Sequence, residues 1–134
     1  WCKEFAESNK LNVEFKGFVP NAEVLKIVAS SKALVLPTQW YEGFPMSIVE
    51  AFSVGTPVIC SDLGNAGSIV EEKITGFKFQ YNESDSLKCV IKEFESYDIK
   101  LLQQSVYEKY RRYFDQNRNY EMLQTIYRES KKNL

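Results

Sequence analysis

The chain has 134 residues, 44% of them hydrophobic, which suits one domain with a buried core and excludes global disorder. A formal net charge of −1 gives no support for a nucleic-acid-binding protein. The chain contains no histidine, which removes the commonest general base and the commonest metal ligand. Its three distant cysteines form no metal or redox motif, so reduced thiols and a cytoplasmic location are expected: Cys2, Cys60 and Cys89.

The sequence pattern of the first quarter of the chain predicts alternating helices and strands. Residues 1–9 are typical of the end of a helix, and residues 12–18 of a short strand. Asn21 is a typical cap for a helix that runs to about residue 30. Residues 33–36 form a continuous apolar run, Ala-Leu-Val-Leu, which predicts a strand buried on both faces of a parallel sheet.

The next predicted helix is the most informative element. It is expected to begin near Pro45, because proline favours the first helical turn, and to end before Gly55, which readily takes the left-handed stop position. Only Ser47, Glu50 and Ser53 are polar between these points, and helical spacing places Ser47 and Glu50 on one face. A carboxylate in such an apolar helix needs partners, and the hydroxyl groups of a bound sugar are one source.

The remaining segments continue the alternation. Strands are expected at residues 58–60 and 77–79, with a turn-rich loop at 63–67 and a short helix at 68–72 between them. Three helices follow, identified by apolar residues at helical spacing: Leu87, Val90, Ile91 and Phe94; Leu101, Leu102, Val106 and Tyr110; Tyr120, Leu123, Ile126 and Tyr127. The pattern predicts an α/β fold: a Rossmann-like open parallel sheet with helices on both faces and a helical carboxy-terminal end.

The charge is unevenly distributed along the chain. From Lys100 onward there are 8 basic and 4 acidic residues, a balance of +4, whereas the preceding residues have a balance of −5. A basic helical end is most often a solvated face, and the alternative is peripheral contact with a membrane surface or with another domain. No apolar run is long enough to span a bilayer.

The loop at residues 37–44 is the expected site of chemistry. Ligands of open α/β sheets bind outside the carboxyl ends of the strands, and this loop leads from such an end into the amino terminus of the Pro45 helix. Unpaired backbone N–H groups at a helix amino terminus attract phosphate, and Gly43 allows close approach to the backbone. With Glu42 before this cradle and Glu50 beyond it, a ligand with phosphates between two sugars, such as a nucleotide-sugar, would fit.

Residues around the two glutamates resemble the signature of retaining glycosyltransferases of family 4: Pro37, Glu42-Gly43-Phe44-Pro45, Glu50-Ala51-Phe52, Gly55-Thr56-Pro57-Val58-Ile59 and Ser61-Asp62. Members have the GT-B architecture, in which two Rossmann-like domains face a cleft. The resemblance covers about residues 13–79. It implies that residues 1–134 are a single donor-nucleotide domain, a carboxy-terminal fragment without the acceptor domain, and that this fragment alone is inactive.

The resemblance also implies the chemistry and the role of each residue. The enzyme would transfer a hexose-type sugar from a nucleoside diphosphate sugar, such as a UDP-sugar, to a hydroxyl acceptor in polysaccharide biosynthesis. The reaction would retain configuration and use neither metal nor cofactor. Glu42 would act beside the transferred sugar, and Glu50 would accept hydrogen bonds from the ribose. Five residues would line the donor sugar and the diphosphate: Gly43, Phe44, Pro45, Met46 and Ser47.

The sequence departs from the family pattern and leaves alternatives open. The Arg and Lys that bind the diphosphate in the family lie upstream of this segment, and residues 64–68 replace the frequent Gly-Gly and Pro-Glu pairs. Trp40 and Tyr41 are either a stacking platform or packing residues. A non-catalytic nucleotide- or phosphate-binding module is the alternative function, and it would not need Glu42. A receiver-like signalling domain would need an acidic pocket that the sequence lacks.

Overall fold

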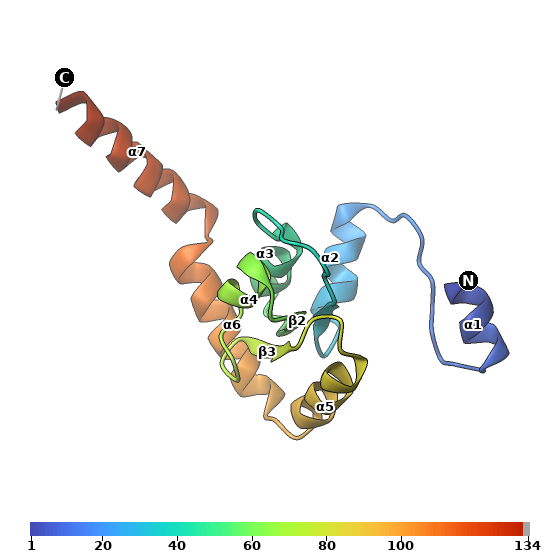
Figure 1. Ribbon diagram of the computed structural model, residues 1–134. Coiled ribbons are helices and arrows are strands. Elements are labelled where there is room, and N and C mark those ends of the chain that lie inside the picture. The colour runs from blue at the N-terminus through green and yellow to red at the C-terminus, as the bar shows by residue number, and fades with distance from the viewer. Residues whose placement is uncertain (133–134) are drawn as a thin grey trace.

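A computed structural model describes residues 1–132, which form seven helices around a three-stranded sheet (Figure 1). The strands are parallel and lie in the order β1 (Leu34–Leu36), β2 (Val58–Ser61) and β3 (Gly76–Phe79). The helices are α1 (Cys2–Ser8), α2 (Asn21–Ala29), α3 (Met46–Ser53), α4 (Gly64–Ile69), α5 (Ser84–Glu95), α6 (Ile99–Tyr113) and α7 (Gln116–Lys132). The predicted open parallel sheet with a helical carboxy-terminal end is confirmed.

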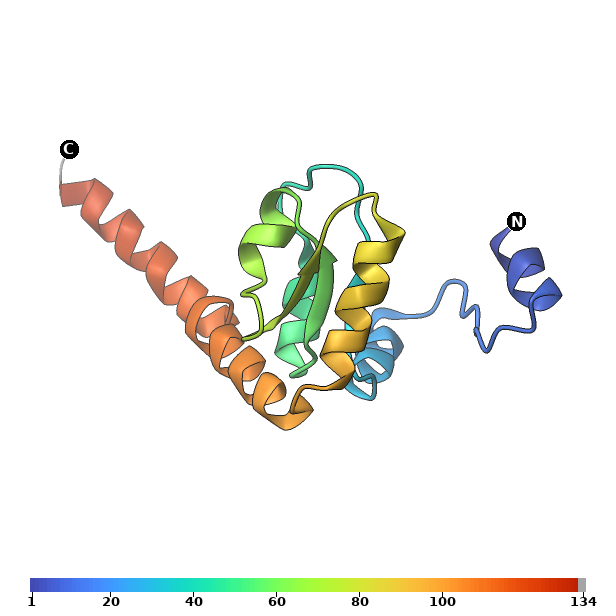
Figure 2. The same cartoon turned by 60° about the horizontal axis from the view of Figure 1, so that its bottom comes forward.

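Alternate residues of β2 enter two apolar layers, one on each face of the sheet. On one face, Val58 and Cys60 form a cluster with side chains of α3, α4 and α6. On the other face, Ile59 packs with Phe77 of β3 and with Phe94 of α5. Figure 2 shows α5 on the opposite side of the sheet from α4. Helices therefore cover both faces, as the sequence predicted, and β2 is buried along its whole length.

Helix α3 has the boundaries that the sequence predicts. Pro45 is its N-cap residue, and Gly55 follows the helix with a φ of 75°. The N–H of Thr56 donates to the carbonyl of Ala51 at 2.9 Å, and the N–H of Gly55 donates to the carbonyl of Phe52 at 3.1 Å. This pair of bonds is the Schellman motif, which requires a residue that tolerates positive φ.

Two expectations for the first third of the chain are wrong. Residues 12–18 form no strand, because their backbone pairs with no strand in the described part of the chain and lies away from the sheet (Figure 1). Phe18, for example, is 98% exposed. Strand β1 is not buried on both faces, because Leu34 and Leu36 are only partly buried and Val35, on the opposite face, is 41% exposed. It is also an edge strand of the described sheet, so one of its sides has no neighbouring strand.

The segment that follows β2 folds differently from its expected order of loop and helix. Helix α4 occupies Gly64–Ile69, where a loop was expected at residues 63–67, and it ends before residues 71 and 72. Burial of Ala66 and Gly67 against the sheet outweighs the poor helix propensity of the glycines. The chain then turns, since the N–H of Glu71 donates to the hydroxyl of Thr75 at 2.9 Å.

The cap of α2 differs by one residue from the sequence prediction. Asn21 is the first residue of α2, and Pro20 is the N-cap. Side-chain caps occur on α6 and α7 instead. Asp98 Oδ1 accepts from the N–H of Lys100 at 2.9 Å, and Asp115 Oδ1 accepts from the N–H of Asn117 at 3.0 Å.

Helix α7 extends away from the body of the molecule, as both views show (Figures 1 and 2). Helix α6 packs through Leu102 and Val106, each of which joins one of the two apolar layers. None of the helices within residues 1–132 combines the length and the hydrophobicity that a membrane span requires.

Gly76 is expected to be essential to the sheet. A β-carbon there would lie 1.8 Å from the carbonyl oxygen of Val58, so the two strands would have to move apart. We expect Gly76→Ala to lower the free energy of unfolding by about 3 kcal/mol, as measured by urea titration of the full-length protein. The matched control is Gly43→Ala, where a β-carbon meets nothing within 4 Å. An unchanged urea midpoint for Gly76→Ala would contradict this packing.

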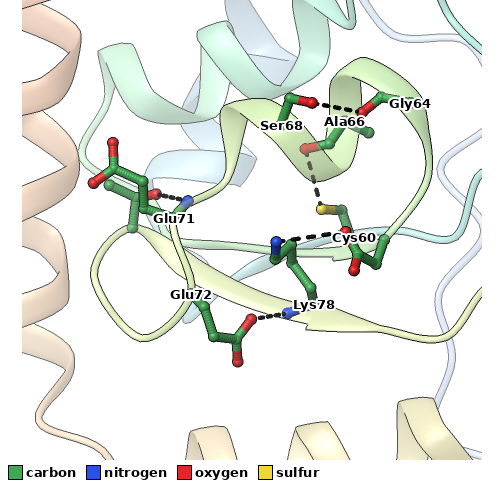
Figure 3. Close-up of polar contacts among 9 residues, drawn as sticks. Cys60, Gly64, Ala66, Ser68, Glu71, Glu72 and Lys78 are labelled. Carbon is green, nitrogen blue, oxygen red and sulfur yellow. Dashed lines mark hydrogen bonds and ion pairs between the residues drawn. The ribbon is translucent and has the colours of Figure 1, made fainter.

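Cys60 is expected to be chemically inert in the folded protein. Its side chain is fully buried, its thiol donates to the carbonyl of Ala66 at 3.5 Å, and burial raises its pKa to about 12 (Figure 3). The thiolate is the reactive form, so iodoacetamide at pH 8 should modify the exposed Cys89 and spare Cys60. Peptide mass spectrometry measures the extent of labelling at each of the two thiols. Equal labelling of the two thiols in the native protein, rather than only in urea, would refute the expectation.

Candidate functional site

The loop at residues 37–45 connects the carboxyl end of β1 to the amino terminus of α3. All three strands are parallel, so the segments that follow β1, β2 and β3 meet at the same edge of the sheet. The residues that the sequence singles out lie in this loop and in the first turns of α3. The loop therefore has the position that ligand-binding loops occupy in open α/β sheets.

The first half of the loop is tied to the end of β2. Thr38 is 7% exposed, and its carbonyl accepts a hydrogen bond from the hydroxyl of Ser61 at 2.7 Å. The Thr38 hydroxyl in turn lies 3.2 Å from the carbonyl oxygen of Trp40 and 3.4 Å from Glu42 Oε1. A short series of polar contacts thus connects β2, through Thr38, to the carboxylate of Glu42.

The second half of the loop rests on α4 and on the junction of α6 with α7. The side-chain amide of Asn65 donates to the carbonyl of Glu42 at 3.2 Å and also to the carbonyl of Gly43. The ring of Phe44 packs on Phe114, with 6.3 Å between the ring centroids. These contacts hold the loop at both ends and near its middle.

Glu42 is half-buried and borders a cavity of about 260 Å³ at the carboxyl end of β1. The cavity has five other lining residues: Leu36, Pro37, Thr38, Gln39 and Trp40. A carboxylate in this place can accept hydrogen bonds from a ligand in the cavity while the Thr38 hydroxyl holds one of its oxygens.

The amino terminus of α3 presents unpaired backbone donors. The N–H groups of Met46 and Ser47 donate to no acceptor within residues 1–132, whereas the N–H of Ile48 donates to the carbonyl of Pro45 at 3.1 Å. Pro45 is buried and has no N–H, so it can contribute only shape. Free N–H groups and the helix dipole together attract an anion to this end of the helix.

Glu50 lies one turn beyond Ser47 on the same helix and is half-buried. No donor in the described part of the chain forms a hydrogen bond or an ion pair with its carboxylate. No buried side-chain oxygen within residues 1–132 lacks a partner, so the unpaired carboxylate of Glu50 is in contact with solvent. Its charge is therefore accessible to a ligand rather than sealed by the protein.

The two loop aromatics are exposed, at 70% for Trp40 and 79% for Tyr41. Tyr41 also contacts α4, because a β-carbon at Gly64 would lie 2.8 Å from Tyr41 Cδ1. The structure thus assigns packing to one side of the Tyr41 ring and leaves stacking on a ligand open for both residues.

A second cavity, of about 220 Å³, lies beside this loop at the same edge of the sheet. The side-chain amide of Gln39 donates to Asn82 Oδ1 at 3.3 Å there. The sequence alone assigned no site role to four polar residues that shape this edge: Thr38, Ser61, Asn65 and Asn82. One signal was present, because each lies at the end of a strand or in the connection that follows it.

An ion pair joins β3 to the segment that follows β2. Lys78 Nζ lies 3.4 Å from Asp62 Oδ1, and the backbone N–H of Lys78 donates to Glu72 at 2.9 Å (Figure 3). No three acidic, cysteine or histidine side chains within residues 1–132 are grouped so that they could hold a metal ion.

Residues 1–117 match the family model of glycosyl transferases group 1. An uncharacterised glycosyltransferase of Methanocaldococcus jannaschii is 30% identical over 104 residues, which cover 73% of this chain and 26% of that protein. This chain thus spans about a quarter of the length of that relative.

Solved structures of GT-B glycosyltransferases share the fold. A sucrose-phosphate synthase from Thermosynechococcus elongatus superposes with a TM-score of 0.84 and 21% identity, over 99% of this chain and 34% of its own. Anabaena HepE, solved in complex with UDP and glucose, gives a TM-score of 0.75 and 23% identity, over 92% of this chain and 35% of its own. The family model matches residues 1–117, which are most of this chain. The chain therefore belongs to the glycosyl transferases group 1 family.

Proposed function

We propose that this chain is the donor-nucleotide domain of a retaining, family 4 type glycosyltransferase. The enzyme transfers a hexose-type sugar from a nucleoside diphosphate sugar to a hydroxyl acceptor. The acceptor wall of the cleft lies outside residues 1–134. An enzyme with a further domain beside this one is supported by the matching solved structures, because the chain spans only about a third of each. Residues 1–134 alone are therefore expected to show no transfer and only weak nucleotide binding.

One observation carries the proposal: free backbone donors and an unpaired carboxylate lie on the same helix, whose amino terminus is at the carboxyl edge of the sheet. The N–H groups of Met46 and Ser47 suit a diphosphate, and Glu50 suits the hydroxyl groups of a ribose. Anabaena HepE, which shares the fold, was solved with UDP and glucose bound, and this supports a UDP-hexose as donor.

Glu42 takes the role beside the transferred sugar. Its carboxylate borders the cavity at the carboxyl end of β1, where it can bond sugar hydroxyls and stabilise the positive charge that develops on the ring. Gly43 lets the donor approach the backbone, since the space around its α-carbon is open. Phe44 and Met46 are more than half exposed and would line the sugar side, with Pro45 shaping the turn.

We also propose that backbone N–H groups, rather than a metal ion, hold the departing diphosphate. Charge stabilisation by preorganised N–H donors is a general means of stabilising a leaving anion.

The three cysteines are unpaired thiols, which supports the cytoplasm as the compartment.

Glu50 provides the first test, by its effect on nucleotide binding. Calorimetry on the full-length protein should show that Glu50→Ala binds UDP about 10- to 100-fold more weakly, because hydrogen bonds to a charged group are lost. The control is Glu95→Ala, an exposed carboxylate on α5. If Glu50 bonds the ribose, 2′,3′-dideoxy-UDP should bind wild type and Glu50→Ala equally. An unchanged affinity of Glu50→Ala for UDP would refute the assignment.

Glu42 tests whether the domain takes part in catalysis. Full-length Glu42→Gln should release nucleoside diphosphate about 100-fold more slowly than wild type, with UDP affinity retained, because the charge beside the sugar is lost. A panel of UDP-glucose, UDP-galactose and GDP-mannose serves as donors. Turnover equal to wild type would favour a nucleotide-binding module that does not need Glu42.

A further inference from the structure

We propose that Asn65, in the first turn of α4, is a positioning residue that holds Glu42 and Gly43 in their working geometry. The inference rests on the function proposed above for Glu42. Asn65 occupies the segment of residues 64–68 that departs from the family pattern. It acts through the backbone of the loop, and no contact between Asn65 and the donor is invoked.

The side-chain amide of Asn65 donates to two backbone carbonyls of the loop. Its amide nitrogen lies 3.2 Å from the carbonyl oxygen of Glu42 and also donates to the carbonyl of Gly43. An amide nitrogen carries two hydrogens, so both carbonyls can be satisfied at once. The residues joined are more than 20 positions apart in the chain and follow two adjacent parallel strands. The contact therefore links the loop after β1 to the segment after β2, at the carboxyl edge of the sheet.

Glu42 is held between this contact and a second one. Asn65 holds the backbone of Glu42, while the Thr38 hydroxyl lies 3.4 Å from one of its carboxylate oxygens. Thr38 is itself bonded by Ser61 at 2.7 Å. Ser61 is the last residue of β2, and Asn65 follows four residues later, so both supports of Glu42 originate at the end of that strand.

A packing contact reinforces the same junction. The Tyr41 ring lies against Gly64, where φ is 54° and a β-carbon would lie 2.8 Å from Tyr41 Cδ1. Asn65 itself is exposed and outside both apolar clusters, so its removal leaves the core unchanged. Loss of the amide should free the backbone at residues 41–43 without unfolding the domain.

The functional consequence is a separation of catalysis from binding. The nucleotide contacts proposed for α3 do not depend on Asn65, so affinity for UDP should stay within twofold of wild type. Turnover depends on the placement of Glu42, and a shift of about 1 Å can slow a reaction by about 100-fold. We expect Asn65→Ala and Asn65→Asp to lower kcat by about 10- to 100-fold.

The pair of variants separates hydrogen bonding from packing. Aspartate has the shape of asparagine but no donor, so it places a carboxylate against two carbonyl oxygens. If shape alone mattered, Asn65→Asp would behave as wild type. Ser68→Ala is the matched control, because Ser68 is exposed on the same helix and its hydroxyl donates within the helix, to the carbonyl of Gly64 at 3.0 Å (Figure 3).

The experiment uses the full-length protein and two readouts. The first is the initial rate of chymotrypsin cleavage after Trp40 and Tyr41, followed by mass spectrometry. Cleavage should be several-fold faster in Asn65→Ala and Asn65→Asp than in wild type or Ser68→Ala. The second is release of nucleoside diphosphate from UDP-glucose, UDP-galactose and GDP-mannose, with UDP affinity measured in parallel.

The outcomes distinguish this inference from the proposed function. Equal cleavage of all four proteins would overturn the positioning contact, whatever the donor. Wild-type kcat in both Asn65 variants would overturn the role of Asn65 and leave the glycosyltransferase assignment intact. A wild-type protein that turns over none of the donors would count against the proposed function and, with it, against a catalytic role for this contact.

Discussion

Strand β2 lies between two apolar layers, and its burial determines where every loop of the candidate site is placed. Full burial of a side chain such as Ile59 contributes about 1.5–3 kcal/mol, and α3 and α5 supply the opposing surfaces. Because β1 and β3 pair with β2 in parallel, the connections after the strands emerge at one edge. A change that separated β2 from either layer would therefore disturb the site as well as the core.

The site is assembled from contacts that are individually modest. Neutral hydrogen bonds such as those from Ser61 to Thr38 and from Asn65 to Glu42 each contribute about 0.5–1.5 kcal/mol. Their value lies in geometry, because they hold the carboxylate of Glu42 at a cavity in the loop that leads into the start of α3. Glu50 lacks such support from the protein, which suits a group whose partner is a ligand.

Much of the fold and part of the candidate site could be predicted from the sequence. The Pro45 and Gly55 boundaries, the burial of Cys60 and the free amino terminus of α3 follow from local rules about caps and apolar runs. The strand expected at residues 12–18 failed because a strand exists only with a partner strand. Helix α4 was misplaced because burial of Ala66 and Gly67 outweighed the poor helix propensity of Gly64 and Gly67.

The sequence by itself determined the α/β class, the helix that carries Glu50, and the family signature around Glu42. Only the tertiary structure decided that β1 is an edge strand and that Glu50 has no partner within residues 1–132. It also decided that Asn65 bonds the loop of Glu42. The physical reason is range: helix periodicity and caps act over a few residues, whereas these contacts join segments that meet only when the sheet has formed.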